Sequence, residues 1–388
     1  MNMIIAVITM KRAIIFLLTF ILCFSFASVG LAEEQNNALE LTADSAILMC
    51  MDTGDIIYER NAYQHLSPAS VTKVMSILLF LEAIDSGKIS LTDNVSASEN
   101  AASMGGSQIW LEVGEIMTVD ELLKAVIVAS ANDACVALGE FVAGSYTAFI
   151  KMMNDRAAEL GLENTNFENS TGLDDTITNH YSCAYDIAVM ASEVMKHELI
   201  KSYSTIWLDY LRNGETELNN TNKLVNKYNG ITGLKTGTTS NAGFCLCATA
   251  ERDGMNLVAV VLGSDTSDDR FNGATNLLDF GFANYELITP EIDATKITEV
   301  KIRNGKEKSL KPTYNATEQI LVARGSGEIS YEYNINEEME APVSKNDNLG
   351  TIVVYSGEEV IKTIYLKSDK DIETVSFSYI FKKLLNNI

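Results

Sequence analysis

Residues 66–73 read LSPASVTK and lead directly into a helix that the sequence predicts to be buried. Ser67 is a good N-cap, and Pro68 suits the first helical position, where its missing backbone N–H needs no partner. From residue 71 to residue 84 the chain is apolar on nearly every side. A helix without a polar face belongs inside a protein, so the rest of the chain is expected to fold around it.

Strand patterns stand on both sides of this helix. The runs 46–51 and 56–59 flank Asp-Thr-Gly-Asp, which predicts a β-hairpin. Further patterns predict a helix from Thr118, where Glu121 completes a capping box, helices over 149–160, 185–195 and 276–285, and strands over 244–250 and 257–262. Strands, then helices, then strands and a helix predict an α+β fold, in which helices flank an antiparallel sheet.

The length of the chain predicts two domains. Its 388 residues exceed one average domain. Three of the four prolines fall after residue 289, and from residue 297 the pattern alternates and turns often, without a helix pattern before residue 374. We therefore expect a main domain over residues 33–289 and a small all-β domain, a β-sandwich, over residues 290–373.

The N-terminus has the pattern of an export signal. A basic pair at residues 11–12 precedes an almost wholly apolar run, and Ala32 ends a stretch of small residues that suits cleavage. This order predicts a signal peptide over residues 1–32, and Met10 is an alternative start. An uncleaved membrane anchor is the other interpretation of this segment.

The last residues predict an amphipathic helix over residues 374–388. Apolar side chains recur at helical spacing on one face, namely Phe377, Ile380, Phe381, Leu384, Leu385 and Ile388. The helix is too short and too polar to span a bilayer, but it suits the membrane interface. We expect an exported protein held at the outer face of the cytoplasmic membrane. Packing of the helix on its own protein is the alternative.

Composition excludes several classes of protein. With 47% hydrophobic and 21% charged residues, the chain is not disordered. Its 29 basic and 52 acidic side chains give a net charge of −23, a poor match for nucleic acid, because phosphate contacts need a basic surface. Removal of residues 1–32 takes away two basic side chains and leaves 27 against 52, a net charge of −25.

The cysteines predict neither a disulfide framework nor a metal site. Five remain after residue 32, an odd and sparse number for this length. Cys245 and Cys247 stand in an apolar run without further ligands at zinc spacing, so we interpret them as small buried apolar residues. No metal or other cofactor is expected.

Ser70 and Lys73 are the first candidates for catalysis. They lie three residues apart and so share one helix face. A serine needs a base to become a nucleophile, and a lysine in apolar surroundings has a lowered pKa that lets it accept the proton. The pattern Ser-x-x-Lys alone often occurs by chance.

Two further motifs follow along the chain. In Ser130-Ala131-Asn132 the hydroxyl can relay a proton, and the amide can donate to a substrate carbonyl while accepting from a lysine. Residues 233–239, GLKTGTT, bring a lysine and several hydroxyls to a strand edge, where Gly237 allows another backbone to approach. Such a cluster suits the binding of a carboxylate.

Together and in this order, the three motifs resemble those of the penicillin-binding proteins and serine β-lactamases. The resemblance is closest to the D-alanyl-D-alanine carboxypeptidases; it covers residues 40–285 closely and the rest more loosely. It also includes TGLD at 171–174, HYS at 180–182 and RFN at 270–272. Ala131 stands where the general pattern has Asp, a position at which the carboxypeptidases vary.

The resemblance implies a serine peptidase that removes the terminal D-alanine from peptidoglycan stem pentapeptides and is acylated by β-lactam antibiotics. Ser70 would attack the carbonyl between the two D-alanines, and Lys73 would be the base. Ser130, hydrogen-bonded to a lysine, would pass a proton to the departing D-alanine. Backbone N–H groups of Ser70 and Thr238 would form the oxyanion hole. Asn132 would hold the substrate on its acyl side, and Lys235, Thr236 and Thr239, with Arg270 as a further cation, would bind its terminal carboxylate. Gly237 and Thr238 are the other substrate-binding residues that the resemblance implies.

Other interpretations stay open at the level of the residues. A β-lactamase needs a fast route for hydrolysing the penicilloyl ester, and no Glu-x-x-Leu-Asn pattern stands between the second and third motifs. A non-catalytic penicillin sensor or wall-binding module is the alternative outside the enzymes. A Ser-His-Asp hydrolase would need a histidine beside its serine, whereas we interpret His180 as a structural residue or a residue at the rim of the site. For Arg270 the alternative is a surface salt bridge.

Overall fold

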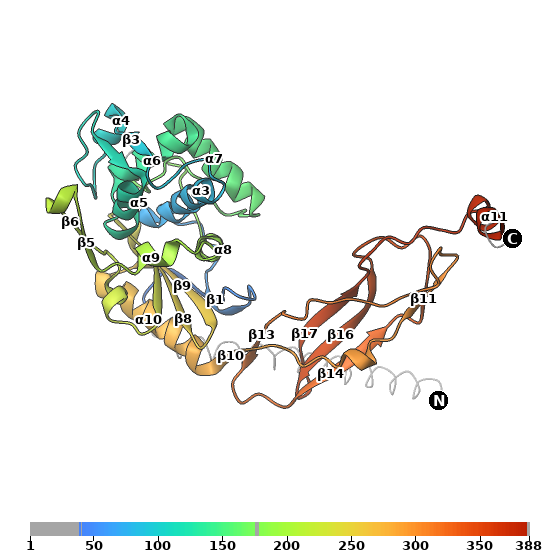
Figure 1. Cartoon of the computed structure of the whole chain (residues 1–388). Coiled ribbons are helices and arrows are strands. Elements are labelled where there is room, and N and C mark those ends of the chain that lie inside the picture. The colour runs from blue at the N-terminus through green and yellow to red at the C-terminus, as the bar shows by residue number, and fades with distance from the viewer. Residues whose placement is uncertain (1–38, 40, 175–177, 386–388) are drawn as a thin grey trace, which may run out of the picture. The chain divides into compact units, whose positions relative to one another are not determined.

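The computed structural model describes residues 39, 41–174 and 178–385, without the side chains of residues 382–384. The predicted signal peptide lies outside the described residues. The chain forms two compact units, a larger one made mainly of residues up to 279 and a smaller one made mainly of residues from 280 onward (Figure 1). The domain limits drawn from the sequence stay a prediction.

The larger unit is built on a five-stranded sheet with the strand order β2-β1-β9-β8-β7. Its strands are β1 (Ser45–Cys50), β2 (Ile56–Arg60), β7 (Ile231–Thr239), β8 (Gly243–Arg252) and β9 (Met255–Ser264). The pairs β1–β2 and β7–β8 are antiparallel. The order leaves β7, which carries the Lys-Thr-Gly motif, at one edge of the sheet, where a strand has backbone groups free for a ligand.

Helices flank this sheet, with α10 on one side and α3, α5 and α8 on the other (Figure 1). The longer helices are α3 (Lys73–Asp85), α5 (Val119–Val128), α6 (Asn132–Ala143), α7 (Tyr146–Glu159), α8 (Ala184–Met195) and α10 (Ser267–Asn284). Short elements between them are α4 (Glu99–Ala102), α9 (Ile200–Ser204), β3 (Asn94–Ser96), β4 (Ile116–Thr118), β5 (Leu208–Leu211), β6 (Thr216–Asn219), η2 (Arg212–Gly214) and η3 (Lys223–Asn226). The predicted α+β class is confirmed.

The helix predicted over residues 71–84 is present and buried. It begins as a 3-10 turn, η1 (Ala69–Thr72), and continues as α3, in which every residue from Lys73 to Leu81 is buried. A helix apolar on all sides gains most by lying where other elements surround it, and α3 packs against several other helices. The first residue of α3 is thereby held in a low-dielectric interior.

Two predicted helix starts have different outcomes. At α5 the capping box is present, because Glu121 N donates to Thr118 Oγ1 at 3.2 Å and Thr118 N donates to Glu121 Oε2 at 2.9 Å. At η1 the predicted cap is wrong, because Pro68 occupies the N-cap position. The hydroxyl of Ser67 donates instead to Asp174 Oδ2 at 3.3 Å.

The smaller unit is all β in its described part, apart from the short turn η4 (Ala294–Lys296) and the terminal helix α11 (Phe377–Leu385). Its three sheets have the orders β10-β13, β12-β11-β15 and β14-β16-β17. The strands are β10 (Tyr285–Ile288), β11 (Val300–Arg303), β12 (Ser309–Leu310), β13 (Ile320–Ala323), β14 (Ile329–Ile335), β15 (Glu338–Glu340), β16 (Asn348–Ser356) and β17 (Glu359–Lys367). The predicted all-β character is confirmed.

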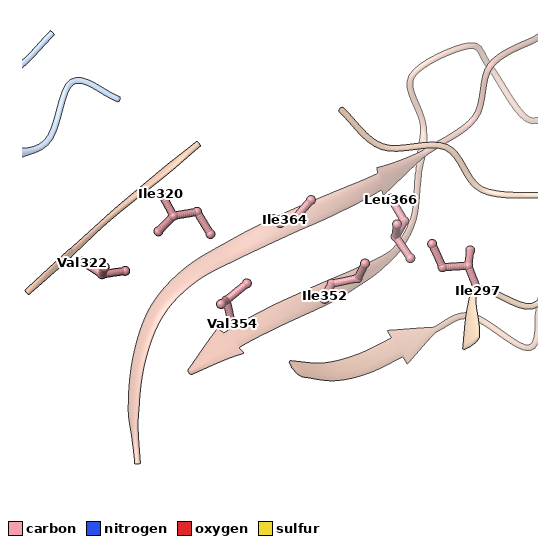
Figure 2. Packing of buried hydrophobic residues seen from close by; sticks show 7 residues of the cluster. All are labelled: Ile297, Ile320, Val322, Ile352, Val354, Ile364 and Leu366. Carbon is pink, nitrogen blue, oxygen red and sulfur yellow. The ribbon is translucent and has the colours of Figure 1, made fainter. Parts of the chain in front are cut away.

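Two groups of apolar side chains form the core of this unit. Figure 2 shows the first, gathered between the ribbon of β16 and β17 and the segments beside it: Ile297, Ile320, Val322, Ile352, Val354, Ile364 and Leu366. The second comprises Val300, Ile302, Leu310, Ala341, Val343, Leu349 and Ile372. Alternate residues of β16 are buried, which is the pattern of a strand with one face on a core.

Three further properties concern the described residues alone. None of their helices is long and apolar enough to cross a membrane. Their five cysteines are free and buried, which agrees with the interpretation of Cys245 and Cys247. No group of three or more His, Cys, Asp and Glu side chains among these residues could hold a metal ion.

Candidate active site

Ser70 lies half-buried in the turn η1, and two glycines let other segments approach it closely. A Cβ atom on Gly172 would lie 1.7 Å from Ala69 O, and one on Gly237 would lie 3.0 Å from Ser70 N. Only glycine leaves room for such approaches. The loop that contains Gly172 and the strand β7 therefore hold the candidate nucleophile from two sides.

Lys73 is fully buried at the start of α3. Its Nζ lies 3.0 Å from Ser70 Oγ, 2.5 Å from Asn132 Oδ1 and 3.1 Å from Thr171 O. Burial lowers the pKa of Lys73 to about 8, and Cys135 offsets part of that effect. About a tenth of this amine is therefore neutral at pH 7, and the neutral fraction rises with pH.

The contacts of Lys73 orient its lone pair. A neutral lysine has two N–H groups and one lone pair. Asn132 Oδ1 and Thr171 O can only accept, so they take the two N–H groups. The third neighbour, Ser70 Oγ, carries a proton that it can donate to the lone pair. This geometry suits proton transfer from serine to lysine.

Asn132 begins α6 and is held on three sides. Its Oδ1 accepts from Lys73, its Nδ2 donates to Gly105 O at 2.7 Å, and its backbone N–H donates to Ser107 O at 2.7 Å. Ser130 lies two residues earlier and is 3% exposed. Within the described chain its Oγ has no hydrogen-bond partner, so the bond to a lysine that the resemblance implies is not formed there.

The strand β7 places Lys235 in the interior beside the other two cations of the site. Lys235 is fully buried, and its Nζ donates to Thr236 O at 3.1 Å. Burial, and then the charges of Lys73 and Arg270, lower the pKa of Lys235. Mutual repulsion of this kind makes the site receptive to an anionic group.

The threonine hydroxyls of β7 are all engaged as donors. Thr236 Oγ1 donates to Thr221 Oγ1 at 2.7 Å, Thr238 Oγ1 donates to the preceding carbonyl at 2.7 Å, and Thr239 Oγ1 donates to Asp174 Oδ2 at 2.6 Å. A hydroxyl has one proton to donate. A substrate carboxylate bound by these threonines would therefore replace one of these contacts.

Arg270 comes from α10 and braces β7 from the interior. It is 8% exposed, and its Nη1 donates to Gly237 O and Thr238 Oγ1, each at 2.9 Å. The guanidinium also lies over the rings of Phe244 and Phe271, and burial lowers its pKa. The alternative of a surface salt bridge does not fit this buried position.

One contact of the site was not indicated by the motifs. His180 Nδ1 accepts from Glu168 N at 3.0 Å, so Nε2 carries the proton and donates to Thr72 Oγ1 at 2.8 Å. Burial lowers the pKa of His180 to about 4, which keeps the ring neutral. The histidine positions the residue between Ser70 and Lys73, a structural role, and does not act on the serine.

A serine whose proton faces a buried lysine, beside a Lys-Thr-Gly strand, defines the class of serine enzymes to which penicillin-binding proteins belong. Comparison with known families narrows the class. Residues 32–266 match the family of D-alanyl-D-alanine carboxypeptidases, and residues 285–374 match the C-terminal domain of penicillin-binding protein 5. The chain belongs to this family and is a D-alanyl-D-alanine carboxypeptidase.

Individual relatives agree with this assignment. The D-alanyl-D-alanine carboxypeptidase DacF of Bacillus subtilis is 40% identical over 386 residues, which cover 97% of this chain and 99% of DacF. Penicillin-binding protein 5 of Haemophilus influenzae has a TM-score of 0.79 at 31% identity and covers 86% of this chain and 98% of its own. A penicillin-binding protein of Listeria monocytogenes, solved with ampicillin bound, has a TM-score of 0.58 at 30% identity and covers 63% of this chain and 99% of its own.

Proposed function

We propose that this carboxypeptidase removes the terminal D-alanine from peptidoglycan stem pentapeptides through an ester on Ser70. The contact of Lys73 Nζ with Ser70 Oγ at 3.0 Å carries the proposal. The neutral amine takes the serine proton while Oγ attacks the carbonyl between the two D-alanines. The C–N bond to the departing D-alanine then breaks as Ser130 gives its proton to the leaving nitrogen and takes the proton that Lys73 holds. Water hydrolyses the ester and restores the Ser70 hydroxyl.

The developing oxyanion would be held by the backbone N–H groups of Ser70 and Thr238. The close approach of Gly237 to Ser70 N supports this, because Thr238 is the next residue along β7. Each donor of an oxyanion hole is worth about 10²- to 10³-fold in rate. Arg270 fixes the same strand through Gly237 O, so we propose that it supports the hole from behind.

Recognition of the substrate would divide between two sides of Ser70. Asn132 would hold the acyl side, where its Nδ2 can turn from Gly105 O to a substrate carbonyl. Lys235, Thr236 and Thr239 would bind the terminal carboxylate. With a net charge of −23 the protein as a whole repels such an anion, so the buried cations at this strand must supply the attraction.

The first prediction concerns Ser70→Ala, which is expected to abolish D-alanine release from a pentapeptide ending in D-Ala-D-Ala and to abolish covalent labelling by penicillin. The reason is that the proposed ester forms on the Ser70 oxygen, which alanine lacks. Release is measured with an assay for free D-alanine, and labelling with a fluorescent penicillin.

Ser86→Ala, at an exposed serine directly after the end of α3, serves as the control and is expected to retain both activities. Release of D-alanine at the normal rate by Ser70→Ala would exclude this mechanism. Rapid turnover of penicillin by the unmodified enzyme would indicate a β-lactamase, and labelling without release of D-alanine would indicate a penicillin sensor.

We also propose that the protein is exported and held at the outer face of the cytoplasmic membrane by its terminal helix. In α11 the apolar side chains Phe377, Ile380, Phe381 and Leu385 are exposed, Phe377 to 84%. Exposed aromatic and aliphatic groups on one short helix suit the boundary between lipid headgroups and acyl chains.

Deletion of residues 374–388 is expected to move the protein from the membrane fraction to the soluble fraction, because the apolar anchor is lost. Cell fractionation with immunodetection measures the distribution. Phe381→Asp should shift it in the same direction, whereas Val360→Asp, a charge placed at an equally exposed position of β17, should not. A deletion variant that stays with the membrane would show that another segment holds the protein there.

A further inference from the structure

Trp110 combines two features that ordinary surface residues avoid. Its side chain is 74% exposed, and its backbone has φ +62°. A bulky side chain with positive φ is an uncommon, strained conformation. Strain of this kind persists only where the surroundings enforce it, and it collects at functional sites. The contacts that hold Trp110 are therefore informative.

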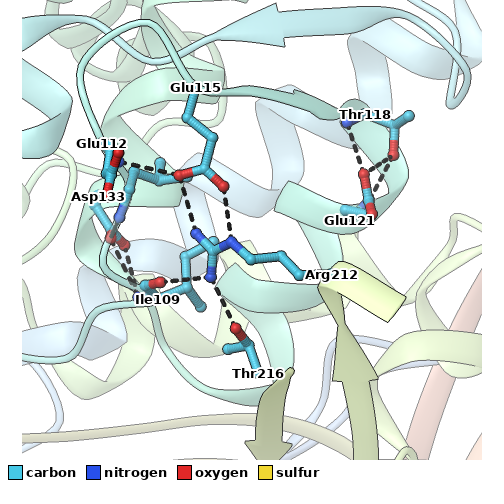
Figure 3. A network of polar contacts seen from close by, with 9 residues as sticks. Ile109, Glu112, Glu115, Thr118, Glu121, Asp133, Arg212 and Thr216 are labelled. Atoms are coloured by element: carbon cyan, nitrogen blue, oxygen red, sulfur yellow. Dashed lines mark hydrogen bonds and ion pairs between the residues drawn. The ribbon is translucent and has the colours of Figure 1, made fainter. Parts of the chain in front are cut away.

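Asp133 holds the backbone on both sides of Trp110. Its carboxylate is fully buried and accepts from Ile109 N at 3.1 Å and from Leu111 N at 3.0 Å. Figure 3 shows this carboxylate facing the backbone of Ile109. Two amides that point to one buried charge leave the residue between them turned the other way, toward solvent.

Arg212 holds the same segment from a second direction. It forms a two-pronged ion pair with Glu115, Nε to Oε1 at 2.7 Å and Nη2 to Oε2 at 3.1 Å, and its Nη1 donates to Ile109 O at 2.8 Å (Figure 3). Arg212 itself has φ +51°. Two charged groups from distant parts of the chain thus hold the strained segment in one conformation.

The held segment is continuous with the acyl side of the active site. Asp133 follows Asn132 directly, and Asn132 is bonded to Gly105 O and Ser107 O, a few residues before Trp110. One run of chain, 105–111, therefore backs the residue that would hold the acyl part of the substrate.

We propose that Trp110 is a specificity-determining residue that packs against the stem peptide on the N-terminal side of the two D-alanines. The inference rests on the proposed function of the site. A rigidly held aromatic ring offers a large apolar face at low entropic cost. It would bind the residues that precede the D-alanines and so favour a complete stem peptide over a short mimic.

A protein-docking surface is the competing interpretation, because Val113 and Ile116 nearby are also exposed, to 67% and 64%. Neither of them has the positive φ of Trp110, and the two amides that Asp133 binds are those on either side of Trp110. If the three side chains formed a docking patch, partner binding would depend on all of them, and the preference between substrates would depend on none of them. Val113→Ala and Ile116→Ala are therefore matched controls.

The test compares kcat/KM for a stem pentapeptide with kcat/KM for N-acetyl-D-Ala-D-Ala in the full chain. In Trp110→Ala the ratio of the two values is expected to fall roughly 3- to 30-fold, the loss expected when one aromatic face is removed. Trp110→Phe should keep most of the preference, and the two control variants should keep the whole ratio. Arg212→Lys, which loses the two-pronged pair, should lower the ratio because the segment loosens. An unchanged ratio in Trp110→Ala would overturn the proposal.

A fluorescence measurement distinguishes a failure of the proposal for Trp110 from a failure of the proposed reaction. The chain has two tryptophans, so Trp207→Phe leaves Trp110 as the reporter, and Ser70→Ala prevents turnover. The pentapeptide is expected to change the emission of this double variant saturably, and N-acetyl-D-Ala-D-Ala to change it much less. Absence of any change with the pentapeptide would count against the role of Trp110. Absence of D-alanine release by the unmodified enzyme from both substrates would instead contradict the proposed reaction.

Discussion

Replacement of Lys73 by methionine is expected to lower the rate of Ser70 acylation about 10²- to 10⁴-fold, the usual contribution of a general base. Methionine keeps the length and burial of the side chain but has no lone pair basic enough to take the serine proton. It also leaves Asn132 Oδ1 and Thr171 O without their donor. The rate is measured with fluorescent penicillin and, independently, as D-alanine release.

The pH dependence identifies lysine as the base. Because the pKa of Lys73 is lowered to about 8, its reactive neutral form grows as the pH rises. Acylation of the unmodified enzyme should increase about tenfold per pH unit up to pH 8 and then level off. Lys73→Met should lose this rise, and Lys88→Met, an exposed position beyond the same helix, should keep it. A rate that is flat from pH 6 to pH 8 would assign the base to another group.

Gly172→Ala is expected to destabilise the larger unit by about 3 kcal/mol or more, because a Cβ atom would sit 1.7 Å from Ala69 O and 2.8 Å from Thr72 Oγ1. The φ of +80° at this position adds conformational strain. Relief of the clash must move the turn that carries Ser70, so acylation should fail as well. Chemical denaturation and penicillin labelling measure the two effects.

Gly161→Ala is the matched control for this prediction. Gly161 has φ +71°, but no atom of the described residues lies within 4 Å of the position of its Cβ. Only the strain of an alanine at positive φ remains, which is expected to lower the free energy of unfolding by about 1 kcal/mol. Equal losses for the two variants would mean that the contact with Ala69 O does not hold the nucleophile.

The parts of the site formed by residues that lie close together in the chain were predictable from the sequence. Ser70 and Lys73 lie three residues apart, and the buried helix that carries them was visible in its apolar run. The capping box of α5 was predictable for the same reason. By contrast, α6 was missed, because its N-cap, Ala131, forms no side-chain cap and so leaves no start signal.

Contacts between distant segments were not predictable, because no local pattern encodes them. Thr72 and His180 are 108 residues apart in the chain. Asp174 accepts a hydrogen bond from the hydroxyl of Ser67, which is 107 residues away in the chain. This contact is why the predicted helix cap was wrong. The fold class followed from periodicity, whereas the orientation of the lysine lone pair and the strain at Trp110 required the assembled structure.

The buried thiols have a practical consequence. All five cysteines of the described residues are shielded inside the protein, and a thiol must be accessible to react. A cysteine introduced at an exposed site, for example Lys88→Cys in the larger unit or Val360→Cys in the smaller one, would be labelled by maleimide dyes well before the native thiols. A donor and an acceptor dye placed at these two sites would report the separation of the two units in solution by resonance energy transfer.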